Sequence, residues 1–354
     1  MLRDGHFGSD THAQAVQVTA SGGPALDHIE IDDARFLFTA HFKKSGSDLI
    51  LTGDDGRKLV LVDYFNTAKH PDLTSHGATL SGDLVAHLAG PDAPGHYAQA
   101  GAPAGAQVIG KCERMGGGAT VQHANGVQED LHAGDAILKG DIVMTNDGSS
   151  LVLSLLDGTV FNMGASARMV LNEVVYDANS TSNSALISLV KGSFTFVAGQ
   201  VAHTGDMKVD TPVATMGIRG TTVNTNVDAD INGNVFSVTY SLMTDPNGNV
   251  GAFQVLDRVT GAVIGNVTST GSVLSVTPAA NFQVLAQETG KSPAQVQQEL
   301  AAAQILFPVY QAVQALTPQP PALPQGPHEL QGPQQQQHTG SRFLTSNLLL
   351  YGAG

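Results

Sequence analysis

The sequence is poor in cysteine and tryptophan and has no long apolar segment. It contains one cysteine, Cys112, and no tryptophan. A single cysteine excludes an intrachain disulfide framework, and it also excludes a zinc site built from several cysteines. No run of about 18 or more apolar residues occurs, so the sequence predicts no membrane-spanning helix. The first residues, MLRDGHFGSDTHAQAVQVTASGG, have no apolar segment typical of a secretory signal peptide. Any export is therefore expected to use a route without such a signal.

Basic residues are also scarce, with 17 Lys and Arg against 31 Asp and Glu, which gives a formal net charge of −14. An acidic protein repels phosphate backbones, and no cluster of Lys or Arg offers a local exception. These features argue against nucleic acid as a partner.

Turn residues and β-forming residues are plentiful, and 40 glycines accompany many Val, Thr, Ser and Asn residues. This composition is typical of an all-β chain with frequent turns. Near the N-terminus, Asp55-Gly56 lies between alternating apolar runs at 48–51 and 58–62, which is a strong signal for a β-hairpin. We therefore expect a small β-meander there.

Composition also divides the chain. Its ends show no apolar period, and a Pro/Gly/Ala-rich stretch separates the meander from a longer β region. The expected parts, in order, are a disordered leader at 1–35, the β-meander at 36–90, a linker at 91–107, a β domain at 108–290, an amphipathic helix at 291–316 and a disordered Pro/Gln-rich tail at 317–354.

Within the β domain, Gly, Asn and Asp interrupt short apolar strands about every ten residues. Asp157-Gly158 is expected to turn the chain, and Gly192 and Gly199 to break it. This pattern fits a sandwich, a barrel or a stacked β-solenoid. After the β domain, Ser292 begins a capping box, which predicts a helix.

In that helix, the apolar residues at positions 296, 300, 303, 307 and 310 share one predicted face. Pro308 is expected to kink or end its first segment.

The stretch TPVATMGIRGT, residues 211–221, combines an apolar alternation with two glycines, a proline and an arginine. Ala214, Met216 and Ile218 fall on one face with period two and are expected to point inward. Gly217 and Gly220 are expected to form corners where a Cβ does not fit, and Pro212 to occupy an edge position without a donor.

Arg219, in the same stretch, is expected to face outward. It could contact a ligand or partner, although its five donors suit a structural role in holding neighbouring loops more readily.

The ordered motifs of the β domain resemble a FecR-type domain, which is found in bacterial extracytoplasmic proteins. The resemblance covers about residues 135–225 and rests on these segments in order: Gly140–Thr145, Gly148–Ser150, Leu155–Thr159, Met163-Gly164, Glu173, Tyr176-Asp177, Val190–Phe194, Thr211–Ala214 and Gly217–Thr221.

This resemblance implies a solenoid-like, twisted stack of short strands that supplies no catalytic residues. It also implies a role in signalling and interaction, with a protein or a component of the cell envelope as the partner. The family's namesakes are membrane-anchored regulators of sigma factors, with a cytoplasmic helical segment and one spanning helix that this sequence does not show. More loosely, the chain is similar to the N-terminal regions of large bacterial surface proteins and adhesins, in which a β-meander precedes such a domain.

Other patterns give only weak indications of chemistry. Asp228, Asp230 and Asn232 match the first half of a calcium loop, but Thr239 stands where the bidentate Glu belongs, and a hairpin turn at Asn232-Gly233 explains the pattern as well. The 13 histidines are scattered and no specific metal site is expected. No cofactor is expected beyond this weak calcium candidate.

Catalysis finds equally little support. A hydrolase could use two carboxylates such as Asp141 and Glu173, although no known catalytic motif accompanies them.

Two hypotheses of function follow. The first is a non-enzymatic interaction or anchoring module at the cell surface or in the extracytoplasmic space, related to a large adhesin. The alternative is an envelope signal-transduction component of the sigma-factor-regulator type that acts with a separate membrane partner.

Overall fold

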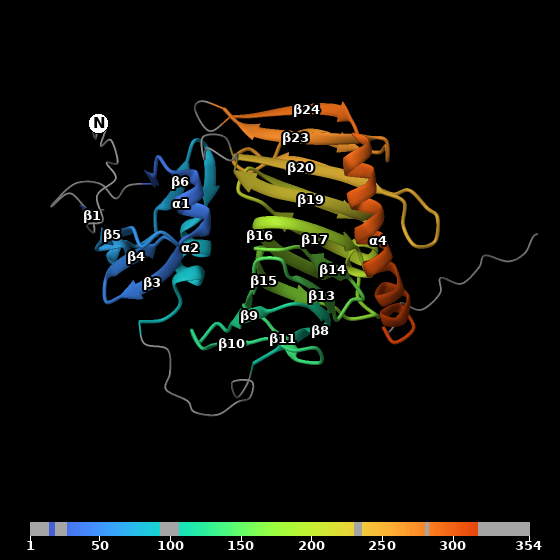
Figure 1. The fold of residues 1–354 in the computed structure, drawn as a ribbon, viewed down its shortest axis with the longest axis horizontal. Coiled ribbons are helices and arrows are strands. Elements are labelled where there is room, and N and C mark those ends of the chain that lie inside the picture. The colour runs from blue at the N-terminus through green and yellow to red at the C-terminus, as the bar shows by residue number, and fades with distance from the viewer. Residues whose placement is uncertain (1–13, 18–26, 93–105, 230–235, 280–282, 318–354) are drawn as a thin grey trace, which may run out of the picture. The chain divides into compact units, whose positions relative to one another are not determined.

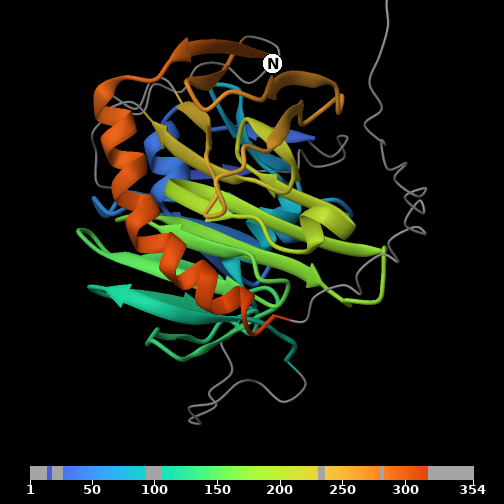
Figure 2. The ribbon, with the colours of Figure 1, turned by 90° about the vertical axis from the view of Figure 1, so that its right-hand side faces the viewer.

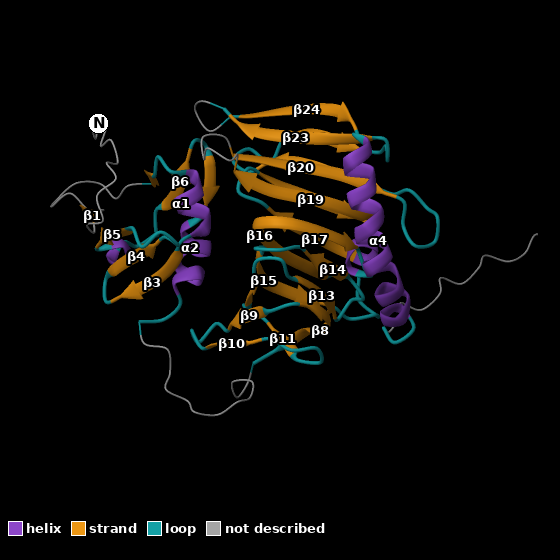
Figure 3. Cartoon of the chain, viewed as in Figure 1, coloured by secondary structure: helices purple, strands orange, loops and turns teal. Residues whose placement is uncertain are grey.

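The computed structural model describes residues 14–17, 27–92, 106–229, 236–279 and 283–317. Contacts divide the chain into the units Met1–Pro320 and Pro321–Gly354, and every described residue belongs to the first. Strands dominate this unit and helices are few (Figure 3). The prediction of a mainly β chain with a helix near its C-terminal end is thereby confirmed.

The N-terminal part, residues 14–17 and 27–92, holds two small sheets and two short α-helices. One sheet has the strand order β1-β5-β4-β3 and the other the order β2-β6-β7. The elements are β1 (Gln14–Gln17), β2 (His28–Glu30), α1 (Ala34–Thr39), β3 (His41–Ser45), β4 (Asp48–Thr52), β5 (Lys58–Val62), the 3₁₀ helix η1 (Tyr64–Asn66), β6 (Asp72–Ser75), β7 (Ala78–Leu80) and α2 (Gly82–Ala89).

This part contains the expected meander, with helices where more strand was expected. β3, β4 and β5 pair antiparallel, and Gly56 in the β4–β5 turn has φ +81°. However, α1 and α2 are helical, each with a side-chain N-cap, Asp33 for α1 and Ser81 for α2. One or two helical turns are too short to show a clear 3.6-residue period, so sequence patterning did not reveal them.

Strand β2 and helix α1 also begin inside the expected leader. The structure buries Ile29 and Ile31 there.

The β domain consists of two long sheets that share one strand. Its elements are β8 (Val108–Gly116), β9 (Ala119–Gln122), β10 (Gln128–Asp130), β11 (Ala136–Leu138), β12 (Ile142–Thr145), β13 (Ser150–Leu155), β14 (Val160–Met163), β15 (Arg168–Val175), β16 (Asn183–Val197), α3 (Val201–Thr204), β17 (Gly205–Asp210), β18 (Ala214–Arg219), β19 (Thr222–Ala229), β20 (Phe236–Met243), β21 (Ala252–Asp257), β22 (Val263–Val267), β23 (Ser272–Pro278) and β24 (Val284–Gly290).

One sheet, which we call the helix-covered sheet, has the order β11-β8-β13-β14-β16-β19-β20-β23-β24. The other, the opposite sheet, has the order β10-β9-β12-β15-β16-β17-β18-β21-β22. Beyond β12, the hairpins β13–β14, β19–β20 and β23–β24 belong to the helix-covered sheet (Figure 1), and the hairpins β15–β16, β17–β18 and β21–β22 belong to the opposite sheet.

Strand β16 passes from one sheet to the other at Gly192. Its residues up to Lys191 pair with β15, and those from Gly192 onward pair with β19. Gly192 has φ +107°, and a Cβ there would overlap Ala167, so only glycine allows this passage. The expected break at Gly192 was wrong, because the 15-residue strand continues through it.

A solenoid is not confirmed. Within these two sheets the neighbouring strands are antiparallel, except for the parallel pair β16–β17. Hairpins such as β13–β14, β19–β20 and β23–β24 alternate with pairs of strands that are not consecutive in the chain. The coarser expectation, a mainly β chain with few helices, describes the arrangement.

One apolar core runs through both sheets and into the N-terminal part. Phe161 and Phe196 stack within it with ring centroids 4.7 Å apart. Phe38 of α1 packs on Phe236 of β20 with centroids 4.3 Å apart. The core therefore includes residues on both sides of the linker.

Helix α4 (Pro293–Gln314) crosses the strands of the helix-covered sheet (Figure 2). The predicted capping box is confirmed, with Ser292 accepting from Gln295 N and Gln295 accepting from Ser292 N. Pro308 was expected to kink or end the first segment of this helix, and it does not end it, since α4 continues through it.

The predicted apolar face of α4 is only partly correct. Leu306 packs against Val152, Val160 and Val197, whereas Val296 and Leu300 are exposed.

Candidate interaction site

The TPVATMGIRGT stretch forms the β17–β18 turn, strand β18 and the turn into β19. Ala214, Met216 and Ile218 are buried, as predicted. Gly217 is not a corner. It lies in the middle of β18 between Lys208 and Gln254, and a Cβ there would meet nothing within 4 Å.

Gly220 is a true corner of the chain. Its φ is +63°, and a Cβ would overlap the His203 ring. Both facts require glycine.

Pro212 and Arg219 flank β18. The Pro212 carbonyl accepts from Thr79 N at 2.8 Å, which joins the β17–β18 turn to β7. Arg219 is exposed, and its side chain makes no hydrogen bond or ion pair with the residues that the structure describes. Its side chain is therefore available to a partner.

Asp157 and Gly158 form the expected β13–β14 turn, and Gly158 has φ +82°. The Asp157 carboxylate is completely buried and accepts from Thr159 N at 3.0 Å, Thr159 Oγ1 at 2.8 Å and Val201 N at 3.1 Å. Burial raises the pKa of Asp157, and these hydrogen bonds oppose that effect. The residue therefore has a structural role in fixing the turn to α3.

The two carboxylates of the hydrolase hypothesis have different partners. Asp141 is buried and accepts from Leu138 N at 2.8 Å, while half-buried Glu173 pairs with Lys139 Nζ at 2.8 Å. Nothing in the described structure joins them in one catalytic arrangement.

Instead, Asp141 belongs to a buried histidine cluster that sequence patterning did not reveal. His123 Nδ1 lies 2.7 Å from Asp141 Oδ1, and His123 Nε2 lies 2.9 Å from Glu129 Oε1. Burial alone would lower the pKa of His123, but the hydrogen bonds to both carboxylates outweigh it and raise that pKa. Burial raises the pKa of Asp141, opposed by the hydrogen bonds from Leu138 and His123. Both ring nitrogens are thus occupied, which indicates a structural ion cluster.

The described residues include only one of the three residues of the calcium candidate. Asp228 is exposed at the end of β19, whereas Asp230 and Asn232 lie outside the described residues. Within the described ranges, no group of three or more His, Cys, Asp and Glu residues has a geometry that could hold a metal ion. Cys112 is buried, and burial raises the pKa of its thiol to about 11.

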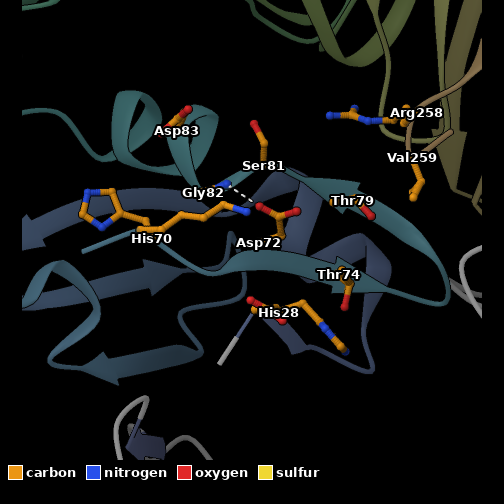
Figure 4. A pocket seen from close by; sticks show the side chains of 12 residues that line it. His28, His70, Asp72, Thr74, Thr79, Ser81, Gly82, Asp83, Arg258 and Val259 are labelled. Carbon is orange, nitrogen blue, oxygen red and sulfur yellow. Dashed lines mark hydrogen bonds between the residues drawn. The ribbon is translucent and has the colours of Figure 1, made fainter. Parts of the chain in front are cut away.

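A polar cavity of about 430 Å³ opens beside β6, β7 and α2 (Figure 4). Asp72 Oδ1 accepts from Gly82 N at 2.9 Å, so this carboxylate serves the start of α2. Figure 4 shows Arg258 and Val259 of the β21–β22 turn across the cavity from Ser81, and Arg258 donates to the Thr211 carbonyl. The lining mixes acidic and basic groups without a catalytic arrangement.

A second opening lies between α1, the β4–β5 turn and the β15–β16 pair. It consists of two cavities of about 590 and 310 Å³, both lined by Thr39, Asp54, Ser166 and Lys191. We call this opening the basic cleft, after Arg168 and Lys191, which line it side by side on β15 and β16. Sequence patterning did not identify either residue as part of a site. The available signal is a single basic residue next to an apolar strand segment, as at Arg168 and Lys191.

No described helix is both long and apolar enough to cross a lipid bilayer. The chain has no match among the curated proteins.

The chain matches two crystal structures of a candidate anti-sigma factor from Parabacteroides distasonis, solved at 2.50 and 1.65 Å resolution. The identity is 19% and the TM-score 0.33 in each case, with 45% of this chain covered. The chain spans 63% and 64% of the length of those two structures.

The family comparison gives a defined region. Residues 141–239 match the model of the FecR protein family, and this match runs from β12 into β20 and includes the TPVATMGIRGT stretch. The predicted resemblance is confirmed, and this chain carries a FecR-type region.

Proposed function

We propose that the chain is a protein-binding component of envelope signal transduction of the sigma-factor-regulator type, acting with a separate membrane partner. The family match over residues 141–239 carries the proposal, because the FecR family is known for signalling and interaction. That match favours the signalling hypothesis over the adhesin-related anchoring role, for which the comparisons give no support.

The chemistry of the described residues is consistent with binding. The FecR-type carboxylates Asp141 and Asp157 are committed to buried structural contacts. We therefore propose a non-enzymatic role. We also propose that the chain works outside the cytoplasm, which cell fractionation tests directly.

The outermost strand of the helix-covered sheet is the surface best suited to a protein partner. β24 pairs with β23 on one side, and no other described strand pairs with it. Six of its seven residues are exposed. A strand edge with free backbone donors and acceptors can accept an extended segment of another protein, as in β-augmentation.

Cross-linking and affinity capture of the tagged full chain in its own cells tests the function. Enrichment of a sigma factor or of its membrane-bound regulator, reproduced with the purified pair, is the expected result. Purified chain that instead sediments with insoluble cell-wall polysaccharide, and captures neither regulator nor sigma factor, contradicts the proposal and restores the anchoring hypothesis.

A further inference from the structure

Arg168 is a buried cation without a carboxylate partner. The residue is 8% exposed. Its guanidinium donates to the carbonyls of Ala40 at 3.0 Å and Thr39 at 3.4 Å, at the C-terminal end of α1. No carboxylate of the described residues lies within 4 Å of it. Burial lowers the pKa of Arg168 to about 10, so the group stays charged at neutral pH.

Lys191 lies directly opposite Arg168 in the β15–β16 pairing. It is half-buried, and its ammonium makes no hydrogen bond or ion pair within the described structure. Burial, followed by the charge of Arg168, lowers the pKa of Lys191. Two cations are thus held side by side although each disfavours the other.

The carboxylates of the basic cleft do not neutralise this pair at close range. The Asp54 side chain is 73% exposed and lies 3.9 Å from His41, and Asp147 Oδ1 accepts from Gly148 N. Asp228 is exposed at the rim. The chain has a net charge of −14, yet these two cations have no carboxylate partner in the cleft. Removing each cation from water costs desolvation energy that no nearby carboxylate offsets.

A bound oxyanion would offset the repulsion between the two cations and supply the negative charge that they lack. A phosphate or carboxylate has two or more oxygens, which can accept from a guanidinium and an ammonium at once. Ser166, which lines both cavities, adds a hydroxyl donor nearby, and Arg35 lines the larger one. We propose that the basic cleft binds an anionic group, a phosphate or a carboxylate, between Arg168 and Lys191.

Titration of the full chain with inorganic phosphate, and separately with acetate, tests this site at constant ionic strength set with chloride. Thermal unfolding and calorimetry report binding, and ³¹P line broadening reports contact with phosphate. We expect a saturable rise in Tm with at least one of the two anions, and the stronger of the two identifies the ligand class.

Lys191→Gln is the informative variant, because the Lys191 ammonium makes no hydrogen bond or ion pair within the described structure that the variant would break. It is expected to weaken binding by about tenfold or more. Lys58→Gln, an exposed strand lysine on β5, is the matched control and is expected to bind as wild type does. Arg168→Lys serves as a second variant that keeps the charge and removes the planar fork.

Two results overturn the proposal. One is the absence of a saturable effect from either anion. The other is a Lys191→Gln protein that binds with wild-type affinity, which would place the anion elsewhere. Because the titration uses neither a sigma factor nor a membrane partner, its outcome is independent of the proposed signalling function.

Discussion

Asp157 joins three backbone or hydroxyl donors in a fully buried position, so its loss leaves those donors without an acceptor. Thr159 Oγ1 also accepts from Gly199 N at 2.9 Å, which extends the network to the end of β16. We expect Asp157→Ala to lower the free energy of unfolding by about 3 kcal/mol, measured by urea denaturation. Asp130→Ala, at an exposed aspartate of β10, is the control, and an equal loss in both variants contradicts this role.

His123 should make stability depend on pH in a defined window. Its folded-state pKa is raised above the ordinary value of 6.5, so protonated His123 adds stability that is fully present below that value. The contribution is lost as the pH rises through the raised folded-state pKa. Urea denaturation should therefore show that the free energy of unfolding falls as the pH is raised from about 6 to about 9.

His123→Gln is expected to flatten this pH dependence, because glutamine does not titrate. His132→Gln, at an exposed histidine near Asp135, should leave it unchanged. An identical slope in wild type and His123→Gln would show that the buried cluster has the same proton affinity in folded and unfolded chains.

For single residues, the sequence predicted roles that depend on the local backbone conformation. It did not predict roles that depend on contacts with distant parts of the chain. Asp157-Gly158 and Gly220 were recognised as turns because a left-handed φ leaves a signature in the neighbouring residues. Gly217 looked the same but lies in open space in a regular strand. Arg168 gave no local sign that its partners would be the carbonyls of Thr39 and Ala40, more than 100 positions away.

Among the elements, α4 is fixed to the helix-covered sheet by an ion pair beneath its first turns. Lys291 Nζ lies 2.6 Å from Glu299 Oε2, with both side chains at most 10% exposed. Lys291 Nζ also donates to the Leu242 carbonyl, and Ser241 donates to Glu299. We expect Glu299→Ala to lower the free energy of unfolding by about 3 kcal/mol, since it leaves a buried ammonium unpaired.

The double variant Glu299→Leu with Lys291→Met is expected to recover most of that loss, because no charge then remains buried. Gln298→Ala, on the exposed side of α4, is the control. Thermal unfolding compares all three proteins. A double variant as unstable as Glu299→Ala would show that the ion pair itself, rather than the unpaired charge, determines the docking of α4.

Strand β24 has no described neighbour on one side, and this gives the proposed function a test at a defined surface. Charged side chains on an edge strand oppose the addition of another strand. Ala286→Lys with Gln287→Lys is therefore expected to reduce capture of the partner by about tenfold and to change the free energy of unfolding by less than about 0.5 kcal/mol.

Gln304→Lys with Gln311→Lys adds the same charge on the exposed face of α4 and is the control for that variant. Equal capture by both double variants and by wild type would mean that the partner does not bind at β24.

The start of the long helix α4 could be predicted from its capping residues, whereas the side of the helix that packs on the sheet was harder to predict. The capping box at Ser292 placed the start of α4 correctly. Its face was only partly assigned, because Glu299 is buried in an ion pair with Lys291, a contact that the apolar pattern does not reveal. Val296 and Leu300 are exposed as a result of the same orientation.

For the molecule as a whole, turn spacing indicated short strands in the β domain, but it carried no information on how the hairpins are distributed between two sheets. That order depends on the passage of β16 at Gly192, which a single φ above zero permits. Composition likewise placed a linker at 91–107. It could not show that one apolar core continues on both sides of it.

This continuous core predicts that the N-terminal part and the β domain unfold together. Phe38 and Phe236 pack directly, and the Pro212 carbonyl accepts from Thr79 N. Hydrogen exchange with mass spectrometry across a urea series should give one midpoint for residues 27–92 and 106–279. Phe236→Ala should lower the free energy of unfolding by about 3 kcal/mol and shift both midpoints equally. The reciprocal variant is Phe65→Ala, whose ring packs on Tyr64 and His70 within the N-terminal part, and it should also shift both. If each variant shifts only the part that contains it, the two parts fold independently and their shared core adds no cooperativity.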